Sequence, residues 1–430
     1  MGTANRTGPL ARVVPRPSMD GAGWRNVWLL AAVSLISDVS GEMLQAVLPF
    51  LLVAQGATGL GIGLVGGVTE GFGQVFKLVG GYVGARVKRK RFLVGSGYLL
   101  ASLSRFGVAF ATAWPVSLAF RSLDRVGKGL REAPRDTILA DSIPKSQRGR
   151  AFGLHRAGDT LGAVIGVTLA IAILWHYYSP QEVEQAGVEA NVVLVGAVIG
   201  LTSVVPLFFV REAADGATPA APLPMEPLSP RYGSFLAVAA LFHLGHVSYL
   251  FFILRAYELG DIALPLVGVI PGLVAAVLWY LVFNLVYVAA SYPAGVITDR
   301  IGRVRVLVIG YGLAALASGL FFLTPSAWTL AAGFLTLGFS YAATEGTGRT
   351  LAADLAGTHG RSVRLGWYQF TVGIATLLGG VAAGLLWDTL GHRAAFAWGA
   401  ALSVLALVAL ALWAPIKRSR QSPKPPALLD

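Results

Sequence analysis

Cysteine is absent from this chain of 430 residues. Disulfide bridges, thiolate metal sites and cysteine nucleophiles are therefore excluded. Charged residues are also scarce, at 13% of the sequence, whereas a soluble domain carries roughly a quarter. A soluble chain of this length would need more polar surface to cover its core, so the composition excludes a disordered chain and argues against a cytoplasmic enzyme.

Hydrophobic residues make up 55% of the sequence, and they gather in long runs. A helix needs about 20 mainly apolar residues to cross the hydrocarbon core of a bilayer. The runs predict an all-α membrane protein with twelve transmembrane helices, at 27–51, 60–84, 92–112, 116–140, 150–174, 191–210, 233–255, 267–296, 303–324, 327–349, 365–387 and 393–414. Pro271 falls near the start of the eighth run, where we expect a kink or a re-entrant start.

Lys and Arg outnumber Asp and Glu by 34 to 22, which gives a net charge of +12. Outside the predicted spans they gather before the first run, after every second run and in the C-terminal tail, whereas the opposite connections hold only Arg393. The positive-inside rule therefore predicts a multi-pass protein of the cytoplasmic (inner) membrane with both termini in the cytoplasm. We expect anionic lipid headgroups, and no nucleic acid, as the partner of this basic surface.

A Pro- and Ala-rich stretch at 211–232 predicts a linker between two halves of the chain. The predicted organisation is an N-terminal cytoplasmic tail, a six-helix bundle, the cytoplasmic linker, a second six-helix bundle and a cytoplasmic tail, at 1–26, 27–210, 211–232, 233–414 and 415–430. Small residues at Gly63, Gly67 and Gly71 form a stripe that predicts close helix packing.

The two halves repeat at an offset of about 213 residues. Across the halves Gly81, Arg86, Arg89, Glu132 and Thr137 correspond to Gly295, Arg300, Arg303, Glu345 and Thr350. Repeated halves of this kind build many secondary transporters, with a substrate site between them near the bilayer midplane.

The stretch Gly295-Val-Ile-Thr-Asp299-Arg300-Ile-Gly302-Arg303 follows the eighth run. It resembles the loop motif of the major facilitator superfamily, Gly-x-x-x-Asp-Arg-x-Gly-Arg, and the resemblance extends over the whole chain through the twelve runs, the linker and the repeat. It implies two pseudo-symmetric six-helix bundles that form a proton- or ion-coupled porter working by alternating access. On this basis we expect neither an enzyme nor a bound cofactor.

The resemblance also implies a cytoplasmic gate, to which we assign Gly81, Arg86, Arg89, Gly295, Asp299, Arg300, Gly302 and Arg303. Asp299 would lie near the start of the fifth span, where free backbone N–H groups favour an anion. The first copy of the motif departs from the family, because Ala85 replaces its Asp and Lys88 its Gly. The fifth-helix antiporter pattern lacks its proline, since Val167 follows Gly166, which weakens an assignment as a drug/proton antiporter.

The fourth run contains eight charged residues, and at 100° per residue they fall within an arc of about 140°. Lipid cannot border this arc, because a charge at mid-bilayer costs about 3 kcal/mol. Either the arc is an ion-pair ladder, expected chiefly at the cytoplasmic end, or it is a cationic cavity wall that receives an anionic group. For the second interpretation we predict the substrate-binding residues Arg121, Arg125, Lys128, Arg131, His155 and Arg156.

Acidic residues in the first, second and fifth runs are candidates for proton coupling. A carboxylate that alternates between a dry and a wet environment takes up and releases a proton, although a permanent salt bridge is the alternative at each position. We predict proton coupling at Asp38, Glu42, Glu70 and Asp159. His243 and His246 are three residues apart, but without converging acids they favour hydrogen bonding over metal binding, and we predict no metal site.

The sequence thus predicts a monomeric, proton-coupled secondary active transporter of a small anionic organic solute, with export favoured over uptake. Within transport, the alternative is a carrier of a metal chelate or a siderophore-like compound. From other classes, the alternatives are a non-transporting membrane receptor and a membrane-embedded enzyme. The chain shows no clustered catalytic constellation and no soluble signalling domain in support of these two.

Overall fold

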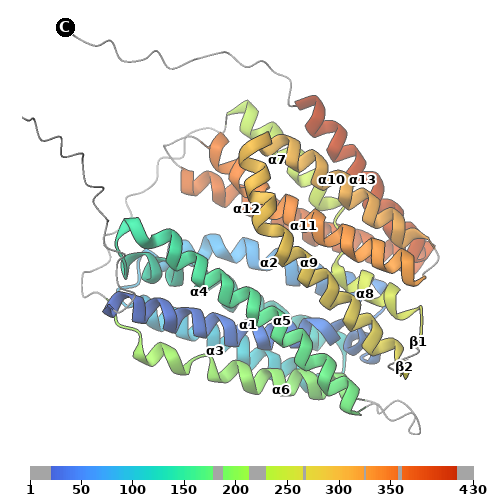
Figure 1. Cartoon of the computed structure of the whole chain (residues 1–430), viewed down its shortest axis with the longest axis horizontal. Coiled ribbons are helices and arrows are strands. Elements are labelled where there is room, and N and C mark those ends of the chain that lie inside the picture. The colour runs from blue at the N-terminus through green and yellow to red at the C-terminus, as the bar shows by residue number, and fades with distance from the viewer. Residues whose placement is uncertain are drawn as a thin grey trace, which may run out of the picture.

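A computed structural model describes residues 21–177, 187–212, 229–264, 268–323, 326–356 and 361–413. Long helices run side by side through this part of the chain (Figure 1). Most of the predicted N-terminal tail, the centre of the linker and the predicted C-terminal tail lie outside the described residues, so the predicted domain boundaries stay predictions.

The first half of the chain forms six spans, each of which overlaps one predicted run. They are α1 (Ala22–Ala54), α2 (Gly59–Gly84), α3 (Lys90–Ala109), α4 (Trp114–Asp141), α5 (Arg148–Tyr177) and α6 (Val188–Thr202), with short 3-10 turns at Lys145–Gln147 and Val205–Phe209. A proline lies in the first turn of α4, where its missing N–H removes no helical hydrogen bond.

The second half also forms six spans, but the first of them is broken. Its elements are α7 (Pro230–Leu244), α8 (Tyr249–Tyr257), the strands β1 (Ile262–Leu264) and β2 (Gly268–Ile270), α9 (Gly272–Ile301), α10 (Arg303–Phe322), α11 (Ala327–Leu355), α12 (Arg361–Leu390) and α13 (His392–Trp413). Helices α7 and α8 together form the seventh span, interrupted at 245–248. Across the described residues this gives twelve spans, which confirms the predicted all-α fold.

The eighth span differs from the prediction at its start. The predicted run begins at residue 267, whereas β2 occupies Gly268–Ile270 and pairs antiparallel with β1. Pro271 caps α9, which begins at Gly272. A residue before proline is driven into extended backbone, so the helix cannot extend backward through this position.

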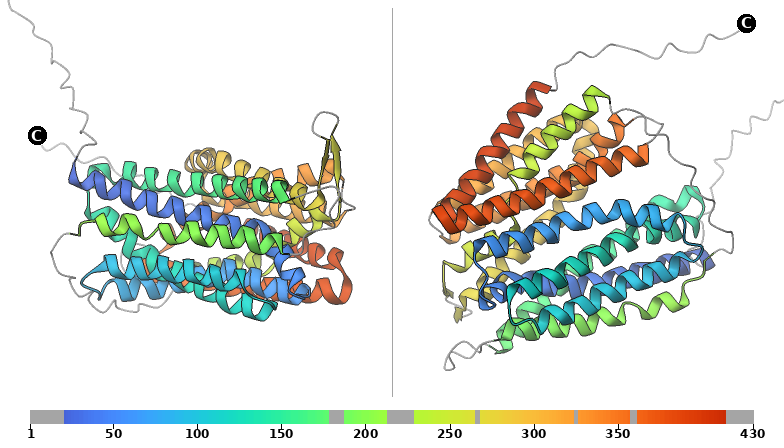
Figure 2. Two further views of the ribbon diagram at one scale, coloured as in Figure 1. Left: turned by 90° about the horizontal axis from the view of Figure 1, so that it is seen from below. Right: turned by 180° about the vertical axis from the view of Figure 1, so that it is seen from behind.

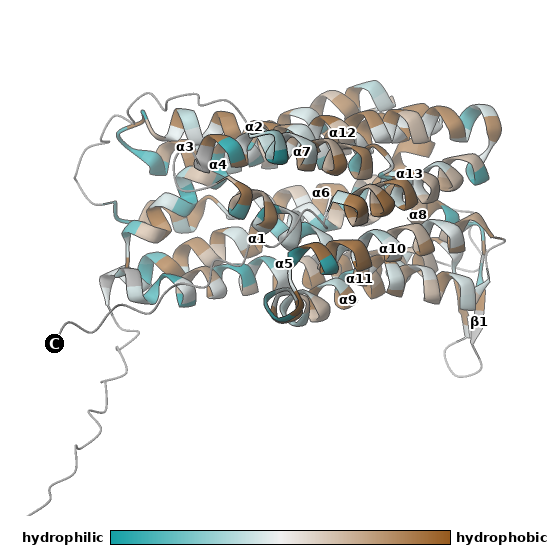
Figure 3. Ribbon diagram, turned by 90° about the horizontal axis from the view of Figure 1, so that it is seen from above, coloured by the Kyte–Doolittle hydropathy of each residue, from teal (hydrophilic) through white to brown (hydrophobic). Residues whose placement is uncertain are grey.

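Nine helical segments of the described chain are long and apolar enough to cross a bilayer. Hydrophobic residues accordingly cover long stretches of the helices (Figure 3). The spans that fall short of this apolar character are α2, α4 and α11. They contain polar and charged side chains such as Glu70, Asp124 and Glu345, so these three helices are the natural place to look for a functional site.

The β-hairpin stands at one end of the molecule, which we call the hairpin face (Figure 2). The opposite end bears the turns after α2 and α9 with their Lys and Arg residues, and we call it the basic face. The helices run between these two faces, so the faces correspond to the two sides of the membrane. The positive-inside rule predicts that the basic face is cytoplasmic.

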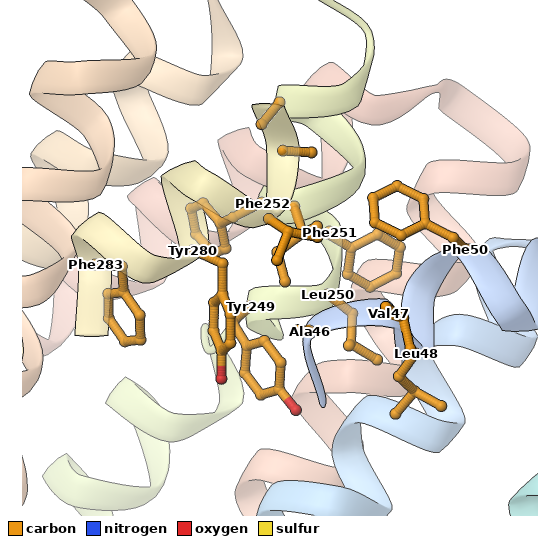
Figure 4. Packing of buried hydrophobic residues seen from close by; sticks show 14 of the residues in the cluster. Ala46, Val47, Leu48, Phe50, Tyr249, Leu250, Phe251, Phe252, Tyr280 and Phe283 are labelled. Atoms are coloured by element: carbon orange, nitrogen blue, oxygen red, sulfur yellow. The ribbon is translucent and has the colours of Figure 1, made fainter. Parts of the chain in front are cut away.

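The hydrophobic core that the two halves share lies toward the hairpin face. One large core combines side chains of both halves, among them Leu48 of α1 and Leu250 of α8 (Figure 4). Two further cores each belong to one half: Leu30 lies in that of α1, α3, α4 and α5, and Leu307 in that of α7 and α10 to α13. The space between the halves is therefore sealed at the hairpin face.

Candidate functional site

A cavity of about 600 Å³ lies between the two halves, and volumes of about 280 and 260 Å³ adjoin it. Asp136 near the end of α4 and Phe152 near the start of α5 line it, so it reaches the basic face. All three volumes share Glu70, Tyr341 and Glu345. The charged side chains that line the largest volume are Asp38, Glu70, Lys77, Arg125, Lys128, Arg131, Glu132, Arg135, Asp136, Arg156, Asp159, Glu345 and Arg349.

Asp124 of α4 organises the end of the charged arc that lies toward the hairpin face. Its carboxylate is fully buried and lies 2.6 Å from Arg121 Nη1, 2.6 Å from Arg125 Nη2 and 3.4 Å from Arg105 Nη2 of α3. Arg121 also donates to Thr69 Oγ1 at 3.3 Å, and it does not line any of the three volumes. We therefore revise the predicted binding set, because Arg121 lies behind the cavity wall as a structural cation.

The part of the arc nearer the basic face is also paired, mostly with other helices. Lys77 Nζ of α2 lies 2.9 Å from Glu132 Oε2, and Arg135 Nη2 lies 2.9 Å from Asp136 Oδ1. The Arg131 guanidinium lies 3.8 Å from the centroid of the Tyr98 ring. The arc thus contains ion pairs and also lines the cavity, and its densest ion-pair cluster lies toward the hairpin face, not at the opposite end where we expect the ladder.

Lys128 lies between these two clusters and lines both central volumes. Within the described residues, its ammonium group makes no hydrogen bond or ion pair. Arg156 of α5 lines the same volumes, and its Nη2 lies 3.4 Å from the Tyr287 hydroxyl of α9. His155 is buried, with Nδ1 3.6 Å from Asp159 Oδ1. Of the predicted binding residues, Lys128 and Arg156 are therefore the most available to a solute.

The four predicted proton-coupling acids all line the cavity. Glu42 accepts hydrogen bonds from Gln45 Nε2 at 3.0 Å and from the Tyr280 hydroxyl at 2.9 Å. Asp38 lies one turn before Glu42 on α1 and makes no hydrogen bond or ion pair among the described residues. Asp159 has His155 as its partner. The acids thus range from unpaired to fully engaged around one water-accessible space.

Glu70 of α2 makes the densest set of contacts between the halves. Its Oε2 lies 2.5 Å from His246 Nε2 and 3.5 Å from the Tyr341 hydroxyl, and its Oε1 accepts from Ser248 Oγ at 2.7 Å. No spacing in the sequence pairs Glu70 with His246. His243 and His246 stand out in the seventh run, but Glu70, the partner of His246, lies 176 residues away in the chain.

The break in the seventh span places these donors. The helix stops after Leu244, and Ser248 caps α8 by accepting from the backbone N–H of Leu250. His246 therefore lies on non-helical backbone at membrane depth, a feature that occurs where backbone lines a cavity. His243 turns toward its own half, with Nδ1 3.4 Å from Thr376 Oγ1. Across the described residues no three His, Cys, Asp or Glu side chains gather to hold a metal ion.

The second half contributes tyrosine hydroxyl groups and two opposite charges, Glu345 and Arg349, to the cavity. Tyr287 donates to Glu345, the repeat partner of Glu132. Arg349 lies one turn beyond Glu345 on α11 and lines the same space. Tyr249 and Tyr280 stack with ring centroids 5.5 Å apart within the shared core (Figure 4).

The predicted gate residues lie at the basic face but do not bridge the halves. Arg303 Nε lies 2.9 Å from Asp354 Oδ2, within the second half. Asp299 is largely exposed, and among the described residues its ion pair is with Arg303 at 3.8 Å, so the expected placement at the start of α5 is not found. Gly302, at φ 94°, makes the turn that joins α9 to α10.

The other residues of the predicted gate make few contacts. Arg86 folds back over the Tyr82 ring, 3.4 Å from its centroid. No atom lies within 4 Å of a Cβ built at Gly295, and the nearest to one at Gly81 lies at 3.9 Å. The gate is thus an open arrangement at the face that the cavity reaches.

Helices α2 and α12 pack backbone against backbone, because glycines lie at their contact. A Cβ at Gly63 would lie 2.1 Å from the carbonyl oxygen of Gly380, and one at Gly71 would lie 2.4 Å from that of Gly373, which confirms the predicted packing stripe. Asp388 of α12 also caps α2, accepting from the backbone N–H groups of Gly59 at 2.6 Å and Leu60 at 2.8 Å. A carboxylate is favoured there by the helix dipole.

Sequence comparison covers nearly the whole chain. The family model of the Major Facilitator Superfamily matches residues 30–282 and 277–429. An uncharacterized MFS-type transporter of Methanocaldococcus jannaschii is 33% identical over 384 residues, which cover 89% of this chain and 93% of that protein. An uncharacterized protein of Mycobacterium tuberculosis is 27% identical over 399 residues, which cover 90% of this chain and 92% of that protein.

Solved structures of transporters resemble this fold over similar lengths. The nucleoside transporter NupG matches with a TM-score of 0.73 at 14% identity, over 91% of this chain and all of that chain. A POT family transporter in complex with a thioalcohol-conjugated peptide gives 0.71 at 15% identity, over 90% and 95% of the two chains. An inward-facing, unoccupied bacterial homolog of the human lysosomal transporter Spinster gives 0.66 at 15% identity, over 92% and 96%. At such identities the likeness shows the fold alone.

Proposed function

Since this chain belongs to the major facilitator superfamily, we propose that it moves a small anionic organic solute across the membrane by proton-coupled alternating access. Family membership makes the chain a multi-pass membrane transporter of a small molecule and not an enzyme. The anionic solute and the proton are the proposed parts.

Lys128 is the observation on which the anionic solute depends. Its ammonium group lines the cavity and makes no hydrogen bond or ion pair in the described chain, while its neighbours Arg125 and Lys77 are paired with carboxylates. An unpaired charge away from bulk water is costly, so an anion entering the cavity gains from pairing with it. Arg156 lines the same volumes and offers a planar fork to a carboxylate or phosphate group.

Asp38 supports the proposed coupling to protons. It lines the same two volumes as Lys128, and the two opposite charges attract each other. A carboxylate that gives up its negative charge to a proton leaves the ammonium group free for a solute anion. Proton and solute binding at this place are thereby linked.

The conformation supports alternating access. The shared core seals the hairpin face, and the cavity reaches the basic face between two separate cores. If the basic face is cytoplasmic, as the positive-inside rule predicts, this is an inward-facing state.

Flux into proteoliposomes tests the proposed solute class. The panel contains radiolabelled carboxylates, phosphate monoesters, organic cations and neutral sugars, each with and without a pH gradient. We expect an anion to be transported, and the sign of its gradient-driven flux distinguishes export from uptake. Lys128→Met should lower that flux at least tenfold, as loss of a charge-assisted pair of about 1.5–3 kcal/mol implies. Lys128→Arg should keep part of it.

Lys88→Met is the matched control, because Lys88 lies in the loop after α2, away from the cavity lining. Transport of a cation or a neutral solute that Lys128→Met leaves unchanged would contradict the proposed solute class. Proton coupling is tested separately with Asp38→Asn, Glu42→Gln, Glu70→Gln and Asp159→Asn. If all four variants keep gradient-driven flux, the coupling proposal is wrong.

A further inference from the structure

Both carboxylate oxygens of Glu70 are bound by the opposite half of the molecule. His246, Ser248 and Tyr341 supply the donors, at 2.5, 2.7 and 3.5 Å, and Glu70 itself lies in the first half. The side chains of Glu70 and His246 are 17% and 16% exposed, so water in the cavity reaches the pair while protein shields most of it. This cluster is therefore a polar link between the halves that remains in contact with the aqueous path.

The link lies directly beside the seal of the hairpin face. His246 is followed by Val247, and Val247, Tyr249 and Leu250 belong to the core that both halves share. The chain also approaches α2 closely here, since a Cβ at Gly66 would lie 2.5 Å from Ser248 Oγ. The halves cannot part at the hairpin face without separating Glu70 from His246.

We propose that His246 is a proton-coupling residue, and that the proton it shares with Glu70 latches the hairpin face. The inference rests on the proposed function, because it assigns a residue to that coupling. With the proton bound, an imidazolium and a carboxylate face each other across the halves. When the proton leaves to cavity water, a neutral imidazole faces the carboxylate, and no other bond forms or breaks.

Linkage gives the direction of the effect. The closed arrangement holds imidazolium against carboxylate in a shielded site, whereas the parted arrangement leaves His246 in water without its partner. The closed state therefore binds the proton more tightly, and by reciprocity the proton favours the closed state. Acidic pH favours a closed hairpin face, and alkaline pH favours its opening.

Other titratable and charged groups also face this pair across the cavity. The groups that line the same volumes, from α1, α2, α4, α5, α7, α8, α9, α11 and α12, are Asp38, Glu42, Lys77, Arg125, Lys128, Arg131, Glu132, Arg135, Asp136, His155, Arg156, Asp159, His243, Tyr249, Tyr280, Tyr287, Tyr341, Glu345, Arg349 and Tyr368. Many are engaged elsewhere: Arg125 by Asp124, Glu345 by Tyr287, Tyr249 by Gln45 and His243 by Thr376. None of these contacts supplies a second cation to Glu70.

The native chain has no cysteine, so nitroxide labels can be placed without removing any thiol. Phe110→Cys at the end of α3 and Leu390→Cys at the end of α12 put one label on each half at the hairpin face, and both native side chains are 71% exposed. The distance between the labels is measured by pulsed electron spin resonance in lipid nanodiscs between about pH 5 and pH 8. A Val53→Cys and Phe110→Cys pair within the first half controls for label behaviour.

In the wild-type background we expect the short distance at acidic pH, and the open-to-closed ratio should rise by at most about tenfold per pH unit, because one proton is linked. His246→Gln and Glu70→Gln should abolish this pH response. His243→Gln is the matched control, since His243 is on the same span but bonds within its own half. A response that survives His246→Gln, or that His243→Gln also abolishes, overturns the proposal.

The flux assay separates this inference from the proposed function. If the label distance does not change with pH while a pH gradient drives flux, the latch is overturned and the transport proposal stands. If the distance responds to pH through His246 while flux does not depend on the gradient, the pH-dependent latch stands, and the proposed proton coupling is overturned together with the coupling role of His246.

Discussion

Charged side chains inside the membrane are held here in three different ways. Asp124 pairs with three buried guanidinium groups, Lys128 faces the cavity without a hydrogen bond or ion pair in the described chain, and Glu70 is bound by the opposite half. The first arrangement stabilises the bundle, the second is suited to a ligand, and the third is suited to a moving interface. Residue type alone does not distinguish these roles, because all three depend on the partner.

Asp124→Asn should strongly destabilise the protein. It would leave Arg105, Arg121 and Arg125 without their shared counter-charge, and breaking a buried ion pair in this way costs about 3–5 kcal/mol. The thermal unfolding midpoint in detergent should fall by several degrees, read by intrinsic fluorescence.

Asp136→Asn is the control on the same helix. Asp136 pairs with its neighbour Arg135 and its side chain is 46% exposed, so we expect a change below about 1 kcal/mol. Equal losses of stability in the two variants would contradict the structural role assigned to Asp124.

At the scale of the helix, the α2–α12 contact depends on the absence of side chains. The glycines at 63 and 71 face backbone carbonyl oxygens of α12, and Asp388 caps the start of α2. Backbone approach of this kind gives packing that apolar side chains cannot replace in a membrane, where the hydrophobic effect does not drive helix association.

Gly63→Ala should push α2 and α12 apart, because its Cβ would lie 2.1 Å from the Gly380 carbonyl oxygen. We expect a loss of about 1–3 kcal/mol in thermal unfolding, typical of overpacking. Gly73→Ala on the same helix meets no atom within 4 Å and should be neutral or stabilising. A Gly63→Ala variant as stable as Gly73→Ala would show that the helices have room to adjust.

Local patterns in the sequence predicted the elements well. Apolar runs are set by the bilayer thickness, and the arc on α4 and the glycine stripe on α2 follow from helical periodicity, so each was readable within one segment. The break at 245–248 was not predicted, because the seventh run is apolar on both sides of it, and Pro271 predicted an irregular start of the eighth span but not a hairpin. Glu70 and His246 meet only once helices far apart in the chain have been packed, which no spacing in one segment encodes.

At the scale of the whole molecule, one side of the membrane should have access to the cavity. Ser291 of α9 lines the largest volume, and Trp328 at the start of α11 is exposed at the hairpin face. A membrane-impermeant maleimide should therefore modify Ser291→Cys from the basic face and Trp328→Cys from the hairpin face. In right-side-out and inverted vesicles, the positive-inside rule predicts that the basic face is the cytoplasmic one.

Modification of Ser291→Cys from the outside of right-side-out vesicles, with Trp328→Cys reacting only from the inside, would reverse the predicted orientation. Modification of both variants from one side would contradict the sealed hairpin face. Since the chain has no other thiol, each signal comes from a single position.

The large apolar core that joins the two halves has a calorimetric consequence. Opening the hairpin face wets side chains such as Leu48 and Leu250, and exposure of apolar groups to water raises the heat capacity. The equilibrium between the two access states should then be curved in temperature, with the sealed form weakened on cooling as well as on strong heating. An organism that lives across a range of temperatures would thus inherit, from the packing at one end of this protein, a thermal optimum for its transport cycle.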